Sequence, residues 1–426
     1  MTRCRPMIKP RTPWAWVPTL YMAEGIPYVA VNTLSVIMYK RLGLTNTDLA
    51  FYTSLLYLPW VIKPLWSPVV DALRTKRWWI LAMQSIFIIA LAGAGGALAG
   101  SAWLPFTLIA FWLLAFSSAT HDIAADGLYI LALDSHQQSL FVGIRSTFYR
   151  IATVVTQGLL VWFAGQMEAT HSIRVAWMTA FLLMAAAFIL LTAWHAYALP
   201  TPERFAAPAF NVRQILSQFL QTLRTFAHKP HILPALLFML LFRLPEALLT
   251  KMATPFLLDT REHGGMGLST SDVGWVYGTV GIIALTAGGL LGGWLVARYG
   301  LRRMMWWLVA AISLPDLVYV CLSLMPATPL WGVSACVAVE QLGYGIGFTA
   351  YMLYLVYFAR GESATSVYAL CTAFMALGMM LPGLAAGWLA DQLGYPLFFT
   401  AIVLLCGVTA LVSACVSVDD AFGRKG

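Results

Sequence analysis

Long apolar runs recur along the whole chain and are separated by short polar connections. Each run is about as long as the roughly 20 helical residues that cross a bilayer. The pattern predicts an all-α membrane protein with two six-helix halves, residues 1–198 and 231–426, joined by a linker at 199–230. The twelve transmembrane helices are expected at 14–38, 48–70, 78–99, 104–132, 140–165, 174–198, 231–258, 272–297, 304–325, 330–358, 364–390 and 396–417.

The composition supports this class of protein. Of the 426 residues, 60% are hydrophobic and only 10% are charged, whereas soluble domains contain about 25% charged residues. The net charge of +8 does not indicate a nucleic-acid partner, because Lys and Arg are concentrated in alternate connections. The remaining connections contain only Lys40, Arg41, Arg174 and Arg261. Since a basic excess marks the cytoplasmic side, we expect both termini in the cytoplasm. The lipid bilayer is the expected environment of the spans.

The two halves contain similar segments. Residues 44–51 (LTNTDLAF) align with residues 268–275 (LSTSDVGW), and the same offset places Arg74 on Arg298. In each copy a Ser or Thr precedes an Asp at the start of an apolar run, which is typical of a helix N-terminus. Internal repeats are expected of transporters that bind a substrate near the membrane midplane, between two halves.

Two aspartates fall within the predicted fourth span, in the stretch SSATHDIAADGLYI. Asp122 and Asp126 are four residues apart and therefore share one helix face. Because a charge in the bilayer centre costs about 2.5–3.5 kcal/mol, we expect one of them to pair with Arg150 or Arg145 of the fifth span. Close carboxylates favour proton binding, and the neighbouring His121 titrates near neutral pH. The three residues are therefore candidates for proton coupling.

Two alternatives remain for this stretch. The charged pairs can simply orient the fourth and fifth helices, or lie in water at the cytoplasmic mouth of the protein. His121, Asp122 and Asp126 can also be imagined as metal ligands, but no further ligand is apparent, so we predict neither a metal nor a cofactor.

Other spans also contain polar residues at helical spacing. Rows of tyrosine with single charges suit a polar small-molecule substrate that carries rings or sugar faces, although for each tyrosine ordinary packing is an equally good explanation. Lys63 is a further possible charge partner. The candidates for substrate binding are Glu24, Tyr28, Asn32, Gln157, Arg243, Glu246, Glu340, Tyr344 and Tyr351.

A glycine- and arginine-rich segment follows the predicted eighth span. Residues 292–303 (GGWLVARYGLRR) resemble the loop signature GGxLxxRxGxRR of the major facilitator superfamily, and residues 68–77 (PVVDALRTKR) are a weaker first-half counterpart. Small residues allow helices to approach closely, so that charges beside them can hold the cytoplasmic ends together. We expect such a conformational latch at Asp71, Arg74, Gly293, Arg298 and Arg302.

Four segments resemble the branch of this superfamily that contains the muropeptide permeases and acetyl-CoA transporters. They are residues 24–27 (EGIP), 63–71 (KPLWSPVVD), 117–127 (SSATHDIAADG) and 387–391 (GWLAD). The resemblance implies the major facilitator fold and a symporter of the inner membrane, driven by the proton gradient. We also expect a monomer. Its best-known cargo is an anhydromuropeptide. By position, the resemblance marks Lys63, Asp122, Asp126 and Arg150 as functional residues.

Other functions remain open at this point. The branch also includes a permease associated with siderophore clusters, so transport for metal acquisition is an alternative function. The adjacent residues His121 and Asp122 are compatible with it. An intramembrane enzyme or a non-transporting signalling protein is a second alternative. The sequence contains no HExxH, GxSxG or GxxxxGK[ST] motif, so an enzyme lacks the usual support and we predict a transporter.

Overall fold

The computed structural model describes residues 12–201, 212–325, 327–361, 364–419 and 422–423. Within these ranges the chain forms helices joined by turns and contains no strand. Nine helical stretches among the described residues are long and apolar enough to cross a membrane. One of them, Ser366–Cys415, is long enough to cross the membrane twice. The second and fifth spans, which contain charges or breaks, bring the number of membrane crossings to twelve. The prediction of an all-α protein with twelve transmembrane helices is confirmed.

The first six spans contain α1 to α9, which we call the N-terminal helices. The first, second and fifth spans are each built from more than one helical piece. The elements are η1 (Pro13–Ala15), α1 (Val17–Val29), η2 (Ala30–Leu34), α2 (Ser35–Arg41), α3 (Asn46–Leu55), α4 (Leu58–Leu73), α5 (Lys76–Ala97), α6 (Trp103–Ala132), α7 (Ser135–Thr153), η3 (Val154–Leu160), α8 (Val161–Glu168) and α9 (Ile173–Ala198).

The last six spans contain α11 to α18, which we call the C-terminal helices. They follow α10 (Val212–Ala227), which lies in the predicted linker. The elements are α11 (Ile232–Leu241), α12 (Leu244–Leu258), η4 (Arg261–His263), α13 (Thr270–Trp275), η5 (Val276–Gly281), α14 (Ile282–Tyr299), α15 (Leu301–Ser313), η6 (Leu314–Asp316), α16 (Leu317–Leu324), α17 (Leu330–Ala359) and α18 (Ala364–Cys415). Within α18, Gly394 has a φ of 70°, which separates the eleventh from the twelfth span.

The helix-entry pattern of the internal repeat produces matching caps. The Thr45 side chain accepts a hydrogen bond from the backbone of Asp48 at the start of α3. Ser269 and Asp272 form a reciprocal capping box at the start of α13. These bonds satisfy backbone N–H groups that a helix start would otherwise leave unpaired. The two helix starts that the repeat predicts are therefore present.

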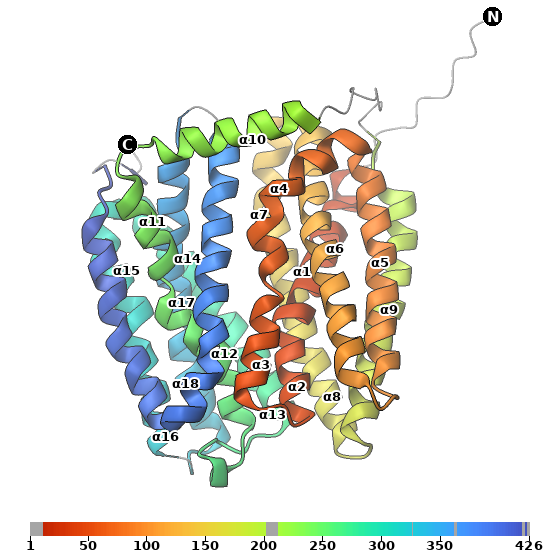
Figure 1. Ribbon diagram of the computed structural model, residues 1–426, viewed down its shortest axis with the longest axis vertical. Helices are drawn as coiled ribbons and strands as arrows, with labels where there is room; N and C mark the ends of the chain where they lie inside the picture. The colour runs from red at the N-terminus through yellow and green to blue at the C-terminus, as the bar shows by residue number, and fades with distance from the viewer. Residues whose placement is uncertain (1–11, 202–211, 326, 362–363, 420–421, 424–426) are drawn as a thin grey trace, which may run out of the picture.

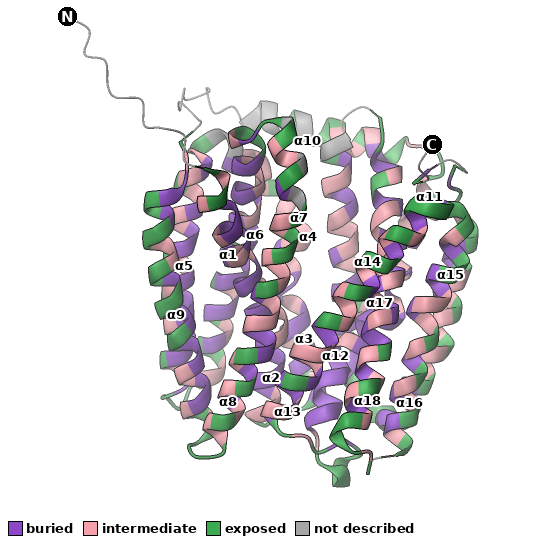
Figure 2. Cartoon of the chain, turned by 180° about the vertical axis from the view of Figure 1, so that it is seen from behind, coloured by how far each residue is buried: buried purple, intermediate pink, exposed green. Residues whose placement is uncertain are grey.

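The two groups of helices stand side by side, and α10 lies across one end of the molecule, which we call the α10 side (Figure 1). Helix α1 begins and α18 ends on this side. Every described residue of α12 from Pro245 to Leu258, except Thr250, is buried. Figure 2 shows the buried residues gathered along α1 and α12, while the outer helices show more exposed residues. The central helices are thus those nearest the contact between the two groups.

The two groups bind each other firmly at the end opposite to the α10 side. Lys40 forms an ion pair with Asp259 at 2.7 Å. Thr47 donates from its hydroxyl and its backbone to Asp391, and Thr270 donates to Glu168 over 2.7 Å. These residues come from the ends of α2, α3, α8, α12 and α13 and from the part of α18 just before its break at Gly394. The structure is therefore closed on this side.

Glycines permit this closure. A Cβ atom added to Gly387 would collide with the Asn46 carbonyl and lie 2.8 Å from Ala50. A Cβ atom on Gly165 would collide with the backbone of Ser271. Because such contacts with backbone cannot be relieved by a rotamer change, the two groups of helices approach this closely only where one partner has no side chain.

We expect Gly387→Val to force the two groups apart on the closed side. Spin labels replacing His171 and Glu262, both exposed beside this contact, should show a longer distance by double electron–electron resonance than in the parent, because the added side chain enters the space of Asn46. Gly407→Val is the matched control, since nothing lies within 4 Å of its Cβ position. An unchanged distance distribution in Gly387→Val would contradict this role.

Candidate functional site

Two ion pairs join α6 to neighbouring helices. Lys63 of α4 pairs with Asp122, and Arg145 of α7 pairs with Asp126 at 2.9 Å. Tyr21 of α1 donates a hydrogen bond to Asp126 over 2.9 Å, and the Arg145 guanidinium lies 4.4 Å from the centroid of the Tyr21 ring. Four helices therefore meet at the two aspartates, and each carboxylate has its own basic partner.

Both aspartates lie inside α6. The helix has 30 residues and is about 45 Å long, whereas the hydrocarbon core of a bilayer is about 30 Å thick. With α6 centred in the membrane, Asp122 lies about 15 Å from the helix end at Ala132, within the core, and Asp126 lies about 9 Å from it, near the boundary. The four paired side chains keep 22% to 40% of their surface exposed.

Glu24 of α1 adds a third carboxyl to the same place. Its side chain lies close enough to Asp122 for a hydrogen bond between the two carboxyls, and its Oε2 atom is buried without a hydrogen-bond partner among the described residues. Ionised carboxylates only accept hydrogen bonds, so a bond between the two carboxyls requires a proton on one of them. Glu24, which stays a predicted substrate ligand, belongs to the charged cluster, the name we give to Glu24, Lys63, Asp122, Asp126 and Arg145.

His121 is not part of the charged cluster. It is fully buried, and its Nε2 atom lies 3.0 Å from the amide nitrogen of Gln84 on α5. The same amide group reaches His195 of α9 at 2.9 Å, and His195 contacts Thr19 at 3.0 Å. His121 therefore points between α5, α6 and α9. The idea of a metal site shared by His121, Asp122 and Asp126 is wrong for the described residues, because their ligand atoms do not converge.

Arg150 was one of the two expected partners of the aspartates, but it pairs with neither of them. Its Nη1 atom donates to Thr286 of α14 over 3.1 Å, and its Nη2 atom lies 3.4 Å from the Cβ position of Gly289. The spacing of polar residues on the fifth span indicated the polar face of the helix but not the direction of this long side chain. Arg150 thus bridges the N-terminal and C-terminal helices.

A buried arginine in the C-terminal helices forms a second site, separate from the charged cluster. Arg243, at the break between α11 and α12, donates to the Tyr344 hydroxyl over 2.5 Å, and its guanidinium lies 4.8 Å from the centroid of the Phe348 ring. Glu246, three residues after Arg243, accepts a hydrogen bond from Thr250 over 2.7 Å. Within the described chain, the Nε atom of Arg243 has no hydrogen-bond partner. Arg243 therefore offers an unused donor beside two aromatic rings.

Aromatic residues lie between the charged cluster and Arg243. Tyr28 of α1 hydrogen-bonds to Tyr57 and packs edge-on against Trp60, with 5.2 Å between ring centroids. The Lys251 amine of α12 lies 5.1 Å from the centroid of Tyr57 and donates to Thr53 over 3.2 Å. Tyr28 and Tyr344, both predicted, thus belong to one polar and aromatic region between the two groups of helices.

The remaining predicted substrate ligands have other surroundings. Asn32 donates to the Tyr28 carbonyl of its own helix over 3.0 Å. Gln157 is buried in η3, where its backbone carbonyl lies against Gly278. Tyr351 is fully buried, donates to the Met239 carbonyl over 2.7 Å and stacks on Phe242, so the ordinary packing explanation holds for it.

Two basic residues of the expected latch lie against aromatic rings. Arg74 is exposed, with its guanidinium 5.7 Å from the Trp78 ring centroid, and the Arg298 guanidinium lies 5.5 Å from the ring of Trp294. The side chain of Asp71 lies outside the described residues. The latch therefore stays a prediction.

Gly293 is not the glycine that permits close packing of α14 and α17, since nothing lies within 4 Å of its Cβ position. Gly288 and Gly292 have this role, because a Cβ atom on Gly292 would lie 2.7 Å from the carbonyl oxygen of Ile346, and one on Gly288 would collide with Leu342. Gly293 follows Gly292 by one position, which on a helix turns the residue by about 100°, and its part in the latch stays a prediction.

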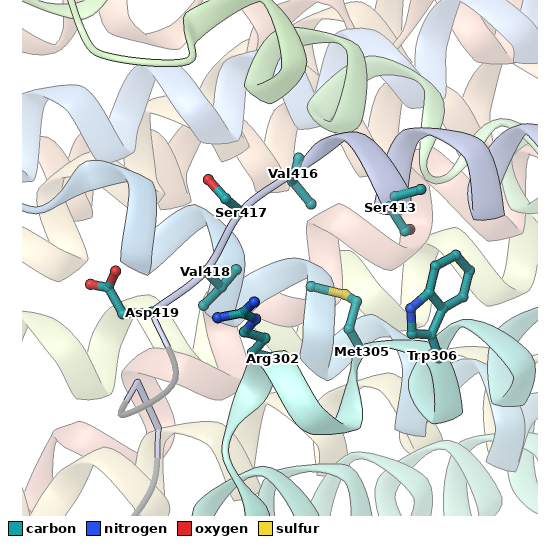
Figure 3. A pocket seen from close by; sticks show the side chains of 9 residues that line it. Arg302, Met305, Trp306, Ser413, Val416, Ser417, Val418 and Asp419 are labelled. Carbon is teal, nitrogen blue, oxygen red and sulfur yellow. The ribbon is translucent and has the colours of Figure 1, made fainter.

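A pocket of about 600 Å³ lies on the α10 side, between the start of α15 and the residues that follow α18 (Figure 3). Arg302, which was assigned to the latch, lines it together with Trp306 and Asp419. This pocket is remote from the charged cluster, because none of its lining residues belongs to the N-terminal helices. We do not regard it as the cargo site.

Sequence reasoning missed several residues of the site. Tyr57 and Tyr149 lie near the charged and aromatic region, but a tyrosine in a span also packs as an ordinary apolar side chain and gave no separate signal. Asp316 is buried and lies close to Glu246 and Glu340. A carboxylate in the middle of the predicted ninth span was a usable signal for Asp316, by the same argument that identified Asp122.

Comparison with known proteins agrees with this architecture. The model of the Major Facilitator Superfamily matches residues 19–370 and 246–426. The anhydromuropeptide permease of Escherichia coli K12 is 28% identical over 391 residues, which are 89% of this chain and 74% of the permease. A putative transporter AmpG 4 of Rickettsia conorii is 23% identical over 402 residues, 91% of this chain and 92% of that protein.

Solved structures show the same fold. A D-xylose–proton symporter superimposes with a TM-score of 0.73 at 10% identity, and the match covers 94% of this chain and 96% of the symporter. The nucleoside transporter NupG gives a TM-score of 0.69 at 16% identity, with coverages of 93% and 96%. The resemblance to the muropeptide permease branch is confirmed by the sequence relatives. The chain belongs to the major facilitator superfamily and is a multi-pass membrane transporter rather than an enzyme.

Proposed function

We propose that this protein is a proton-coupled transporter of the inner membrane that moves a polar, muropeptide-type solute by alternating access, and that it works as a monomer. The observation that carries the proposal is the charged cluster of Glu24, Lys63, Asp122, Asp126 and Arg145 inside the membrane. The similarity to an anhydromuropeptide permease supports the choice of solute.

The charged cluster suggests how a proton affects the conformation. The bond between the carboxyls of Glu24 and Asp122 needs one proton. When Asp122 is ionised, Lys63 of α4 is held to α6; when Asp122 takes the proton, the attraction between α4 and α6 weakens. A proton at this position therefore changes how strongly two helices of the N-terminal group are held together.

The polar and aromatic region supplies groups for the cargo. Aromatic faces such as those of Tyr28 and Trp60 suit sugar rings, and the unused Nε donor of Arg243 suits a carboxylate or an amide oxygen. Because Tyr28 and Arg243 belong to different groups of helices, a solute held by both would favour one relative position of the two groups.

The contacts between the two groups support an inward-facing state. The firm contacts lie opposite to the α10 side, and the basic connections predict that the α10 side is cytoplasmic. In the alternative state these contacts would break, and Asp71, Arg74, Arg298 and Arg302 would form the predicted latch on the α10 side.

The proposal is tested by uptake into proteoliposomes that contain the purified protein. Labelled anhydromuropeptide should accumulate when an inward proton gradient is imposed, and accumulation should be lost with an uncoupler. A metal–siderophore complex is the comparison cargo. If only the siderophore complex accumulates, the proposed muropeptide-type solute is wrong and the siderophore complex is the cargo. Uptake that is insensitive to the uncoupler would contradict proton coupling.

We expect Asp122→Asn to abolish gradient-driven accumulation and to leave membrane insertion intact, because the amide cannot exchange a proton with Glu24. Exchange of labelled cargo across membranes without a gradient should persist. The matched control is Asp134→Asn, which retains a side-chain oxygen to cap α7. Accumulation at the parental rate in Asp122→Asn would rule out the coupling role.

A change at Lys63 tests the ion pair. Lys63→Met leaves Asp122 without its basic partner, so we expect a loss of about 2 kcal/mol of stability, below the roughly 3–5 kcal/mol for a fully buried pair, because both side chains are partly exposed. Thermal melting of the purified protein should show a lower midpoint, and the double variant Lys63→Met/Asp122→Asn should recover most of it. If the double variant melts below Lys63→Met, the two residues do not act as a pair.

A further inference from the structure

A second group of carboxylates lies in the C-terminal helices, away from the charged cluster. Glu246 of α12, Asp316 of η6 and Glu340 of α17 are at most 5% exposed, and one oxygen from each lies within 4.8 Å of the others. Three elements that are distant in sequence therefore direct acidic side chains to one point. We call Glu246, Asp316 and Glu340 the acidic triad.

Only neutral partners satisfy the acidic triad in the described part of the chain. Gln341 donates to both oxygens of Glu340 at 3.2 and 3.0 Å, Thr250 donates to Glu246, and the Cys406 thiol lies 3.4 Å from Asp316. Arg243 lies near enough to attract Glu246 electrostatically, but its Nη2 atom donates to Tyr344 and not to the triad. Three buried carboxylates without a paired amine repel one another strongly unless protons or a cation neutralise them.

Two unused hydroxyls lie beside the acidic triad and favour the cation. The Tyr319 side chain is fully buried, and its hydroxyl has no hydrogen-bond partner among the described residues. It interacts electrostatically with all three carboxyls of the triad, and it follows Asp316 by three residues, on the same helix face. The hydroxyl oxygen of Ser313 is also buried without a partner there. Buried polar groups rarely remain unpaired, so these oxygens point to a ligand that accepts lone pairs.

The space available is small. A cavity of about 10 Å³ lies beside the acidic triad; Glu246, Asp316 and Ser313 line it, whereas Glu340 and Tyr319 do not. Such a cavity holds about one water-sized particle and has no room for a hydrated ion. An Mg²⁺ ion usually keeps several waters, whereas larger hard cations accept carboxylate and hydroxyl oxygens directly.

We propose that Glu246, Asp316 and Glu340 form a binding site for a dehydrated hard cation, Na⁺ or Ca²⁺, to which the Tyr319 and Ser313 hydroxyls contribute oxygens. Both ions take the same oxygen ligands, and the experiment distinguishes them. The site joins α12, η6 and α17, so an ion bound there holds the C-terminal helices in one arrangement. This proposal goes beyond the proposed function and does not depend on the cargo or on proton coupling.

The test measures cation binding to the purified full-length protein in detergent, without cargo. Equilibrium dialysis with radioactive Na⁺ or Ca²⁺ should give saturable binding of one ion per chain, with choline chloride keeping the ionic strength constant. Thermal melting in the same buffers should show a higher midpoint with the bound ion and not with Mg²⁺. Binding of Na⁺ alone identifies a monovalent site, and binding of Ca²⁺ alone identifies a divalent site.

Variants locate the site. Glu340→Gln and Asp316→Asn should each weaken the affinity at least about tenfold, and Tyr319→Phe should weaken it without a change of charge. Glu262→Gln, an exposed carboxylate in η4, should bind like the parent. The proposal is overturned if the parent binds neither ion, or if Glu340→Gln, Asp316→Asn and Tyr319→Phe all bind with parental affinity. Neither result would alter the outcome of the uptake experiments.

Discussion

A charge placed within a membrane must be paired or neutralised, and this constraint explains the central part of the molecule. Asp122 lies within the hydrocarbon thickness of the bilayer, so its ionised form depends on Lys63. Asp126 depends on Arg145 and Tyr21 in the same way. Each pair draws its members from different helices, so the electrostatic requirement also fixes how α1, α4, α6 and α7 pack.

The same constraint makes the charged cluster suitable for coupling. A pair that is held together only by opposite charges weakens when a proton neutralises one member. Close contacts between the N-terminal and C-terminal helices lie on the side opposite to the α10 side, where glycines such as Gly165 and Gly387 allow the backbones to touch. A transporter needs these contacts to break and reform, and ion pairs such as Lys40–Asp259 are suited to this, because water can replace the partners of partly exposed charges.

The fold was largely predictable because it depends on the length and spacing of apolar runs. The limits of α6 differ from the expected fourth span by one residue at its start, and the caps at Thr45 and Ser269 follow directly from local hydrogen bonding. Carboxylates within spans were also identifiable, since the membrane makes them costly. The direction of a long side chain was not predictable: Arg150 and Arg145 lie on the same helix, yet only Arg145 reaches an aspartate. Tertiary groupings such as Glu246 with Asp316 and Glu340 depend on the packing of distant helices, which no local pattern encodes.

The central claim is that a proton binds to the charged cluster together with cargo. The most direct measurement records the pH of a weakly buffered solution of the purified protein while anhydromuropeptide is added. The account predicts a rise in pH, because the cluster takes up protons as cargo binds, and the rise should be absent when Asp122 is replaced by Asn. Cargo binding that leaves the pH of the parent solution unchanged would contradict the account.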